Sequence, residues 1–173
     1  MEILIIVLPL LASIISGFFG KFIGDRNSEI VTSLLVTISA ALSILVLYEV
    51  IANQYQDNIV IATWISSGSL DVNWSMKIDS LSAIMLVVVT SVSSLVHIYS
   101  IGYMSHDPHK PRFMAYLSLF TFAMLMLVTS DNFIQLFFGW EGVGLCSYFL
   151  IGFWFKKDTA NTAAIKAFVV NRI

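Results

Sequence analysis

The charged side chains of this 173-residue chain are spaced so unevenly that long stretches carry no charge at all. Four such stretches hold 18 to 27 residues each, namely 3–20, 30–48, 80–106 and 113–130. A helix needs about 20 mostly apolar residues to cross the hydrocarbon core of a bilayer. Each stretch therefore predicts one membrane-spanning helix.

Two further apolar segments follow. Residues 132–155 form a run of 24 residues interrupted only by Glu141, and another segment begins near Thr159 and is still apolar at Ile173. We therefore expect an all-α polytopic membrane protein with five complete transmembrane helices, the start of a sixth, and no soluble domain. The first span lacks the basic start of a signal peptide and further spans follow it, so we interpret it as a true helix.

The composition agrees with this class and excludes several others. Charged residues make up 12 % of the chain, whereas soluble domains carry about 25 %. The net charge of −2 provides no basic face for nucleic acid. A single cysteine, Cys146, excludes a disulfide framework and a cysteine-ligated iron–sulfur cluster. We expect no cofactor, catalytic residue or metal ligand in this chain.

The loop charges predict an orientation, because Lys and Arg gather on the cytoplasmic side of membrane proteins. One loop cation, Lys77, lies on one side of the expected membrane. The other six follow the first, third and fifth spans: Lys21, Arg26, Lys110, Arg112, Lys156 and Lys157. The N-terminus is therefore predicted to face outside.

The outer loop between the second and third spans has a strand pattern. Residues 72–79 alternate apolar and polar side chains, and residues 59–65 are rich in β-branched ones. Ser66 to Ser69 has the composition of a turn between them. We expect a β-hairpin over about 59–79 on the outer face, which either contacts a neighbouring subunit or covers the chain's own helices.

Glu141 is the outstanding candidate functional residue. It lies about 13 Å inside the expected membrane at 1.5 Å per helical residue. A central acidic side chain costs on the order of 2.5–3.5 kcal/mol, and such groups usually face a bundle interior or a water path. The alternative is a buried carboxyl group that only joins two helices.

Three more ionisable residues lie within spans and complete the candidate proton pathway. Measured from the inner end of the sixth span, Lys166 lies about 10 Å deep and Arg172 about 20 Å. Glu141 lies about 21 Å from the inner end of the fifth span, a depth that matches Arg172. His97 lies well inside the third span, where it either carries protons or makes an ordinary hydrogen bond. In the loop before the fourth span, His106, Asp107 and His109 are weak indicators of a metal site, and we assign none there.

Several motifs resemble a known family, the largest antiporter-like subunit of respiratory complex I, called subunit L in bacteria and chain 5 in mitochondria. The most specific is the run from Phe138 to Tyr148, FGWEGVGLCSY, which is similar to the family's fifth-helix motif. Four shorter runs also match its pattern: 78–82, 97–104, 112–116 and 166–172.

The resemblance implies a proton-translocating membrane subunit of NADH:quinone oxidoreductase, with Glu141 in a proton channel and no redox chemistry in this chain itself. NADH, FMN, iron–sulfur clusters and quinone would be held by other subunits. The partners would be other membrane subunits of complex I, especially antiporter-like neighbours, and the lipid bilayer. The membrane would be the bacterial inner membrane or, alternatively, the mitochondrial inner membrane. Residues 1–173 would be the N-terminal part of one transmembrane antiporter-like domain.

Two other functions stay open at this point. The large subunit of a multisubunit cation/proton antiporter shares the acidic fifth helix, and a non-transporting membrane scaffold would use Glu141 only for structure.

The predicted orientation can be tested by labelling. A cysteine introduced near Gly68, in the expected turn, should react with a membrane-impermeant reagent added to the outer face, because the hairpin is predicted to lie there. Reaction only from the cytoplasmic face would reverse the orientation.

Overall fold

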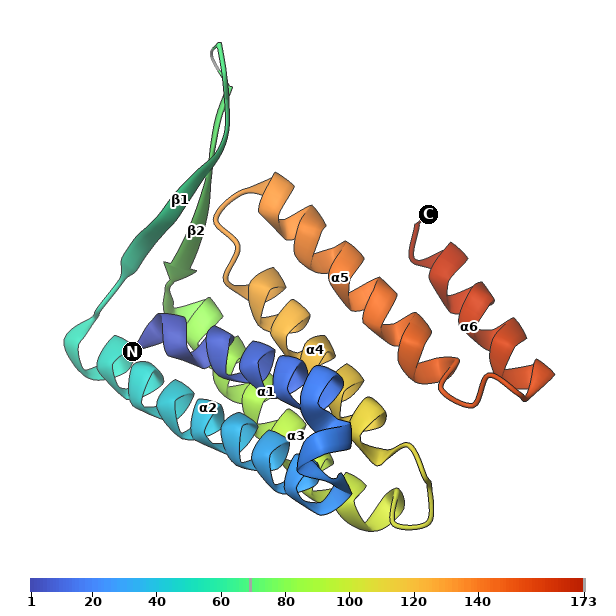
Figure 1. Ribbon diagram of the computed structural model, residues 1–173. Helices are drawn as coiled ribbons and strands as arrows, with labels where there is room; N and C mark the ends of the chain where they lie inside the picture. Colours follow the sequence, from blue (N-terminus) through green and yellow to red (C-terminus); the bar gives the residue numbers. More distant parts are fainter. Residues whose placement is uncertain (69, 173) are drawn as a thin grey trace.

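The computed structural model describes residues 1–68 and 70–172; Ser69, which belongs to the expected turn, and Ile173 lie outside the described residues. Figure 1 shows the order of the elements, a bundle of helices with one projecting hairpin. The elements are α1 (Glu2–Ile23), α2 (Asp25–Asn53), β1 (Asp57–Ser67), β2 (Leu70–Ile78), α3 (Ser80–Tyr103), α4 (Lys110–Val128), α5 (Phe133–Ile151) and α6 (Asp158–Val170).

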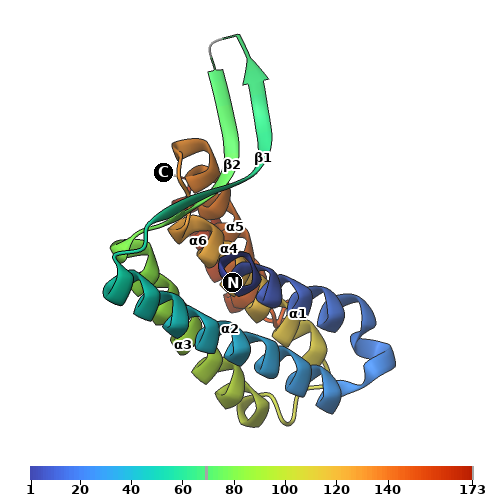
Figure 2. The ribbon, with the colours of Figure 1, turned by 90° about the vertical axis from the view of Figure 1, so that its left-hand side faces the viewer.

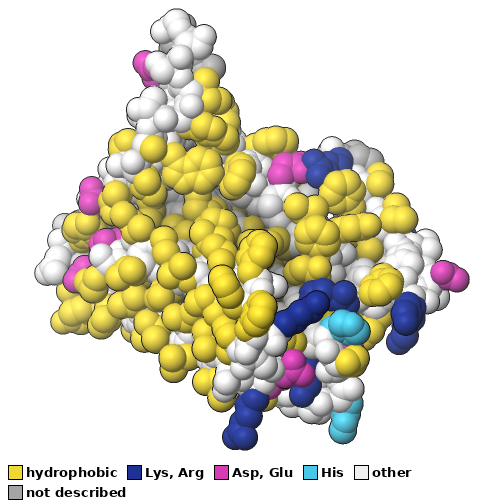
Figure 3. Space-filling view, in the orientation of Figure 1, with side chains coloured by type: hydrophobic (Ala, Val, Ile, Leu, Met, Phe, Trp, Pro, Cys, Tyr) yellow, Lys and Arg dark blue, Asp and Glu magenta, His cyan; other side chains and the backbone are white. Residues whose placement is uncertain are grey.

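The helices α1 to α5 are each long and apolar enough to cross a membrane, which confirms the five predicted spans. Apolar side chains also cover most of the face in Figure 3. Among the described residues of the whole molecule, Phe18, Phe22 and Phe133 are large apolar side chains with exposed fractions of 78 %, 89 % and 88 %. Lipid is the solvent that suits such a surface, and the chain is a membrane protein.

The helices form three successive layers. The first is a bundle in which α1 packs on α2 and α4, and α3 packs on the same two helices. The second layer is α5, which packs on α4, and the third is α6, which packs on α5. Figure 1 shows α6 separated from the bundle by α5.

The helix ends differ from the predicted ones because charged residues near an interface stay helical. Lys21 lies in the last turn of α1 and Asp25 in the first turn of α2, so the expected loop shrinks to Gly24. Gly24 has a φ of 86°, which glycine adopts without strain. An acidic residue in the first turn suits the positive end of the helix dipole.

The fifth helix is also shorter than predicted. Asn132 is its N-cap, because its side chain accepts a hydrogen bond from Gln135 N at 2.9 Å. The helix ends at Ile151 rather than near Phe155, and the chain then turns through Gly152. The sixth helix starts at Asp158, one residue before the predicted position.

The hairpin is confirmed between α2 and α3, with Asp57 opposite Ile78 and Ser67 opposite Leu70. Its base is bound to the loop between α4 and α5. Lys77 N donates to Thr129 O at 2.9 Å, and Asn132 Nδ2 donates to Asn73 O at 2.9 Å. The lower half of β2 therefore covers the chain's own helices.

The far half of the hairpin has fewer contacts. In both ribbon views it extends beyond the helices (Figures 1 and 2). Trp64 packs edge-on against Trp74 with ring centroids 4.9 Å apart, and Phe138 of α5 lies 5.0 Å from Trp74. Between the base of the hairpin and this aromatic cluster, Val60 and Ile61 of β1 are 57 % and 50 % exposed.

The β2 strand departs from simple alternation at Ser75. The pattern predicted one buried and one open face, yet Ser75 and Met76 are both buried. The reason is Gln135, which is 1 % exposed and covers the polar face of the strand. Its Nε2 donates to Ser75 O at 2.6 Å, and its Oε1 accepts from Ser75 N at 3.1 Å.

Asp79 starts α3 with a capping box. Its side chain accepts from Ser82 N at 2.8 Å, while Ser82 Oγ accepts from Asp79 N at 2.7 Å. The hydrogen bond from the Ser82 backbone holds the pKa of Asp79 below its usual range. The cap therefore stays ionised at neutral pH and fixes the junction between hairpin and helix.

The interior of the bundle is apolar at one end and polar at the other. At the hairpin end, buried side chains such as Ile5, Val46, Val50 and Leu86 form the hydrophobic core. At the opposite end, where the loop Lys and Arg residues other than Lys77 lie (the basic end), the buried side chains include many hydroxyl groups: Ser16, Ser28, Thr32, Ser33, Ser94 and Ser100.

The role of Gln135 leads to a stability prediction. Gln135→Ala should leave Ser75 N–H and C=O unpaired in a buried site, at about 1–3 kcal/mol for each group. Hydrogen exchange at the Ser75 amide should therefore accelerate. Gln56→Ala, at an exposed position before β1, is the matched control and should leave it unchanged. Equal protection of Ser75 in the wild type and the Gln135 variant would contradict this role.

Candidate functional site

The structure brings Glu141 and Arg172 together. Arg172 Nη1 forms an ion pair with Glu141 Oε2, and the two side chains are 42 % and 20 % exposed. Arg172 comes just after Asn171, the C-cap of α6, and Glu141 lies in the middle of α5. The helix-rise argument that placed the two residues at one depth is therefore confirmed, and α5 and α6 present them to each other.

Two contacts hold the end of α6 in this position. Trp140 Nε1 donates a hydrogen bond to Asn171 O at 3.1 Å. This bond joins the neighbour of Glu141 on α5 to the neighbour of Arg172 at the end of α6. A Cβ added at Gly144 would overlap the side-chain amide of Asn171, and it would lie 3.0 Å from Asn171 Cγ. Glycine at 144 thus allows the close approach that the ion pair needs.

Aromatic rings connect the ion pair with a cavity. The Arg172 guanidinium lies over the ring of Phe168, 4.4 Å from its centroid. Phe168 packs edge-on against Tyr148 with centroids 5.6 Å apart. Tyr148 is seven residues after Glu141, about 10 Å along α5, and it lines the cavity.

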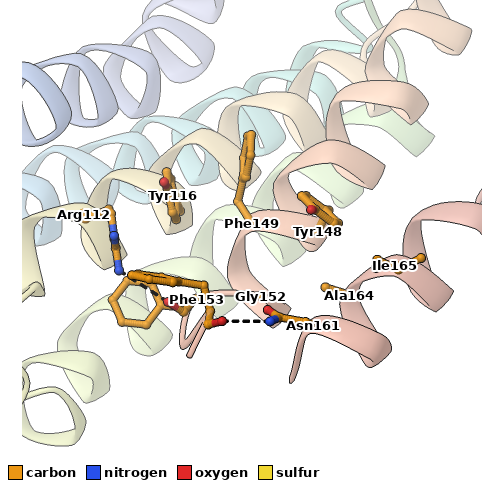
Figure 4. Close-up of a pocket in the computed structure, with 10 residues that line it drawn as sticks. Arg112, Tyr116, Tyr148, Phe149, Gly152, Phe153, Asn161, Ala164 and Ile165 are labelled. Atoms are coloured by element: carbon orange, nitrogen blue, oxygen red, sulfur yellow. Dashed lines mark hydrogen bonds between the residues drawn. The ribbon is translucent and has the colours of Figure 1, made fainter. Parts of the chain in front are cut away.

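This cavity has a volume of ≈ 510 Å³ and lies between α4, α5 and α6 (Figure 4). It is large enough for several water molecules, since each occupies about 30 Å³ in the liquid. Its lining combines aromatic rings with a few polar groups: Arg112, Tyr116, Tyr148, Phe149, Gly152, Phe153, Phe155, Asn161, Ala164 and Ile165.

Arg112 carries the positive charge of the cavity. Its Nη2 donates to Phe153 O at 3.3 Å, and its guanidinium lies 4.7 Å from the centroid of the Phe153 ring. Its Nε is buried and has no hydrogen-bond partner among the described residues. Figure 4 shows the side chain extending from α4 toward the end of α5.

Lys166 is exposed on α6, whereas Ala164 is the buried residue of that helix. Lys166 forms no ion pair within residues 1–68 and 70–172, and the cation that reaches Glu141 is Arg172. The structure thus separates the two cations of the sixth span.

His97 is fully buried between α3 and α4, and its partners are serines. Its Nδ1 lies 2.7 Å from Ser93 O, and its Nε2 lies 3.0 Å from Ser118 Oγ. A carbonyl oxygen only accepts hydrogen bonds, so Nδ1 carries the proton and Nε2 accepts from the serine hydroxyl. Both ring nitrogens are therefore paired in the neutral form.

The loop before α4 uses Asp107 for hydrogen bonding. Asp107 accepts from His109 N at 2.8 Å and from Trp154 Nε1 at 3.0 Å. Burial opposes ionisation, but these hydrogen bonds and the charges of His109 and Arg112 outweigh it and hold the pKa of Asp107 below its usual range. Among the described residues, no three His, Cys, Asp or Glu side chains are arranged to hold a metal ion.

The sequence patterns missed one buried acid, Glu29 of α2. It is 5 % exposed, and its Oε1 lies 3.9 Å from Lys110 Nζ of α4. Glu29 borders an uncharged run and was therefore interpreted as a span boundary. The serines and threonines that follow it at helical spacing were the available signal that this side of α2 is buried and polar.

Two family models of known proteins match segments of this chain. A family model described as "NADH-Ubiquinone oxidoreductase (complex I), chain 5 N-terminus" matches residues 64–114. A second, described as "NADH:quinone oxidoreductase/Mrp antiporter, TM", matches residues 130–173, which include Glu141 and Arg172.

Curated relatives match the whole chain. The chain is 57 % identical over 173 residues, all of its length, to "NADH-ubiquinone oxidoreductase chain 5" of Arabidopsis thaliana. It is 52 % identical over 170 residues, 98 % of its length, to "NADH-quinone oxidoreductase subunit L" of Rickettsia conorii. In both cases it spans 26 % of the relative, about a quarter. These matches confirm the resemblance predicted from the motif around Glu141.

The close approach at Gly144 gives a prediction about the ion pair. Gly144→Ala should push Asn171 away from α5 and separate the Arg172 guanidinium from the Glu141 carboxylate beyond hydrogen-bond distance, about 3.2 Å. A structure of the variant in the assembled protein measures this separation. Gly102→Ala is the control, because a Cβ there meets nothing within 4 Å. An intact pair in the Gly144 variant would refute the packing argument.

Proposed function

Since the chain belongs to the family of NADH-ubiquinone oxidoreductase chain 5 and NADH-quinone oxidoreductase subunit L, we propose that it is a proton-translocating membrane subunit of an NADH:quinone oxidoreductase. In this proposal, quinone reduction elsewhere in the complex drives proton transfer through ionisable residues inside this subunit. Glu141 is the residue that binds and releases the proton.

The observation that carries the proposal is the ion pair between Glu141 and Arg172. An acid in the middle of a membrane span is functional by default, and its partner identifies the charge that acts on it. The Arg172 guanidinium is the positive charge that lies against the Glu141 carboxyl group. A proton that binds Glu141 removes the negative charge, weakens the pair and frees Arg172 to move toward another partner.

The cavity between α4, α5 and α6 supports access to this site from the basic end. Its polar lining residues Arg112, Tyr148 and Asn161 can hold water. From Tyr148, the ring of Phe168 leads to Arg172. We propose that protons reach Glu141 through this cavity, with Tyr148 and Phe168 closing its inner end.

His97 and Lys166 have supporting roles in the proposal. His97 forms hydrogen bonds with Ser93 and Ser118, a chain that can pass a proton if the imidazole binds a second one. Lys166 lies on the exposed side of α6, where a long amine can contact a neighbouring segment or subunit.

The remaining machinery belongs to other subunits in this proposal. NADH, FMN, the iron–sulfur clusters and quinone bind there, and the partners of this chain are the other membrane subunits, with antiporter-like neighbours beside it. The membrane is the bacterial inner membrane or the mitochondrial inner membrane, and the N-terminus faces outside.

A second candidate is the large subunit of a cation/proton antiporter. The observation in its favour is the match of residues 130–173 to a family model that covers both kinds of protein. Copurification with quinone oxidoreductase subunits distinguishes the two, because an antiporter subunit would be isolated without them. A membrane scaffold, the third function, is distinguished by the effect of removing the Glu141 charge.

The test of the proposal is Glu141→Gln in the assembled complex in proteoliposomes. The amide keeps the shape and a hydrogen bond but cannot bind the proton, so translocation should fall strongly while assembly is retained. Glu49→Gln is a matched control, since Glu49 lies near the end of α2 and forms no ion pair within the described residues. Normal pumping by a well-assembled Glu141 variant would leave Glu141 with only a structural role.

A further inference from the structure

A second buried acid lies in the bundle, apart from the site at Glu141. Glu29 is 5 % exposed in the second turn of α2, and its Oε1 has no hydrogen-bond partner among the described residues. Its nearest cation, Lys110 Nζ, is 3.9 Å away, which is longer than a hydrogen bond. The carboxylate therefore needs a further polar contact.

The Ser33 hydroxyl, one helical turn further along α2, also lacks a hydrogen-bond partner among the described residues. The Ser33 side chain is on the same side of the helix as Glu29, because residues four apart are neighbours on a helix surface. Ser33 is 7 % exposed. A buried polar atom without a partner costs about 1–3 kcal/mol, so two adjacent ones indicate a polar occupant.

A water molecule is the occupant that fits these groups. Buried waters typically make about three hydrogen bonds to polar groups that otherwise lack partners. Glu29 Oε1 accepts, Ser33 Oγ donates or accepts, and Lys110 Nζ donates. These three groups supply the number and the mixture of bonds that one water needs.

Hydroxyl groups continue from this site along the contact between α2 and α3. Thr37 Oγ1 bonds to Ser33 O at 2.7 Å and pairs with Ser94 Oγ at 2.8 Å. Further on, Ser43 Oγ pairs with Thr90 Oγ1 at 2.8 Å. From Glu29 to Ser43 this polar seam is about 21 Å long at 1.5 Å per residue.

The seam does not cross the protein. Beyond Ser43 the buried residues of α2 are Val46 and Val50, and before Thr90 the buried residues of α3 include Leu86. These side chains belong to the hydrophobic core at the hairpin end, together with Ile5 of α1. The seam therefore extends from the basic end and stops at the hydrophobic core.

We propose that Glu29, Ser33 and Lys110 bind a buried water molecule, and that Glu29 is a second protonation site of this chain, open only to the basic end. Hydronium that arrives from the basic end gives one proton to the Glu29 carboxylate, which becomes the neutral acid, and a water molecule remains. The charges that act on Glu29 are Lys110 from α4 and Asp25 on α2 itself. From α1, the group packed against this end of α2 is the hydroxyl of Ser16, bonded to Ser28; α3 packs its hydroxyl groups against α2.

The water site is tested by a cryo-EM map of the complete protein at a resolution that shows ordered water. A density peak within about 3.2 Å of both Glu29 Oε1 and Ser33 Oγ is expected. A map in which Glu29 bonds directly to Ser33 or Lys110, with no density between them, would overturn the proposal.

The protonation site is tested by pH-difference infrared spectroscopy of the complete protein. Glu29→Gln should remove one titrating carboxylic acid band, and Ser33→Ala should shift that band because it removes one partner of the water. Ser39→Ala is the matched control, since Ser39 is a fully buried serine of α2 whose hydroxyl bonds to Ile5 O instead. An unchanged set of bands in Glu29→Gln or, should that variant fail to assemble, in Ser33→Ala would overturn the proposal.

Neither measurement depends on proton pumping. The water and protonation tests at Glu29 can therefore succeed even if the translocation test at Glu141 fails, and the reverse also holds.

Discussion

Inside a membrane, a polar group has no water to bond with, and each one must find its partner within the protein. This constraint explains most of the buried contacts of the chain. Many serine and threonine hydroxyls of the bundle bond to one another or to carbonyl groups, either of the preceding turn or of another helix. His97 has a partner for each ring nitrogen, and Gln135 pairs both backbone groups of Ser75. Two groups without a partner among the described residues, Glu29 Oε1 and Ser33 Oγ, are the basis of the proposed water site.

Two acids within the helices, Glu141 and Glu29, lie in separate parts of the molecule, each near a cation. Glu141 meets Arg172 in the outer layers formed by α5 and α6, next to a cavity that contains the charge of Arg112. Glu29 lies near Lys110 inside the bundle, at the end of a polar seam that stops below the hydrophobic core. The hairpin closes the opposite end through its contacts with the loop between α4 and α5. Polar access is thus concentrated at the basic end, which Figure 3 shows as the part where Lys and Arg side chains gather.

The sequence predicted the spans, the hairpin and the equal depth of Glu141 and Arg172. Each follows from a simple pattern: uncharged runs, alternation, and 1.5 Å of rise per residue. It misplaced helix ends, since Lys21 and Asp25 are charged and yet helical. It could not foresee that Gln135 would bury Ser75, because that contact joins residues 60 positions apart. Nor could it detect Glu29, whose burial depends on how α1, α3 and α4 surround α2. Spacing along one helix predicts depth, whereas the direction of a side chain around the helix depends on its neighbours.

The central claim is that Arg172 acts on the charge of Glu141 during proton transfer. A double-mutant cycle in the full-length protein tests it directly, with Glu141→Gln, Arg172→Met and the double variant compared in rates of proton translocation. Residues in contact usually show interaction energies of about 0.5–3 kcal/mol, so the account predicts a double variant clearly different from the sum of the single effects. Strictly additive effects would mean that the two residues act independently, and the ion pair would then have no part in proton transfer.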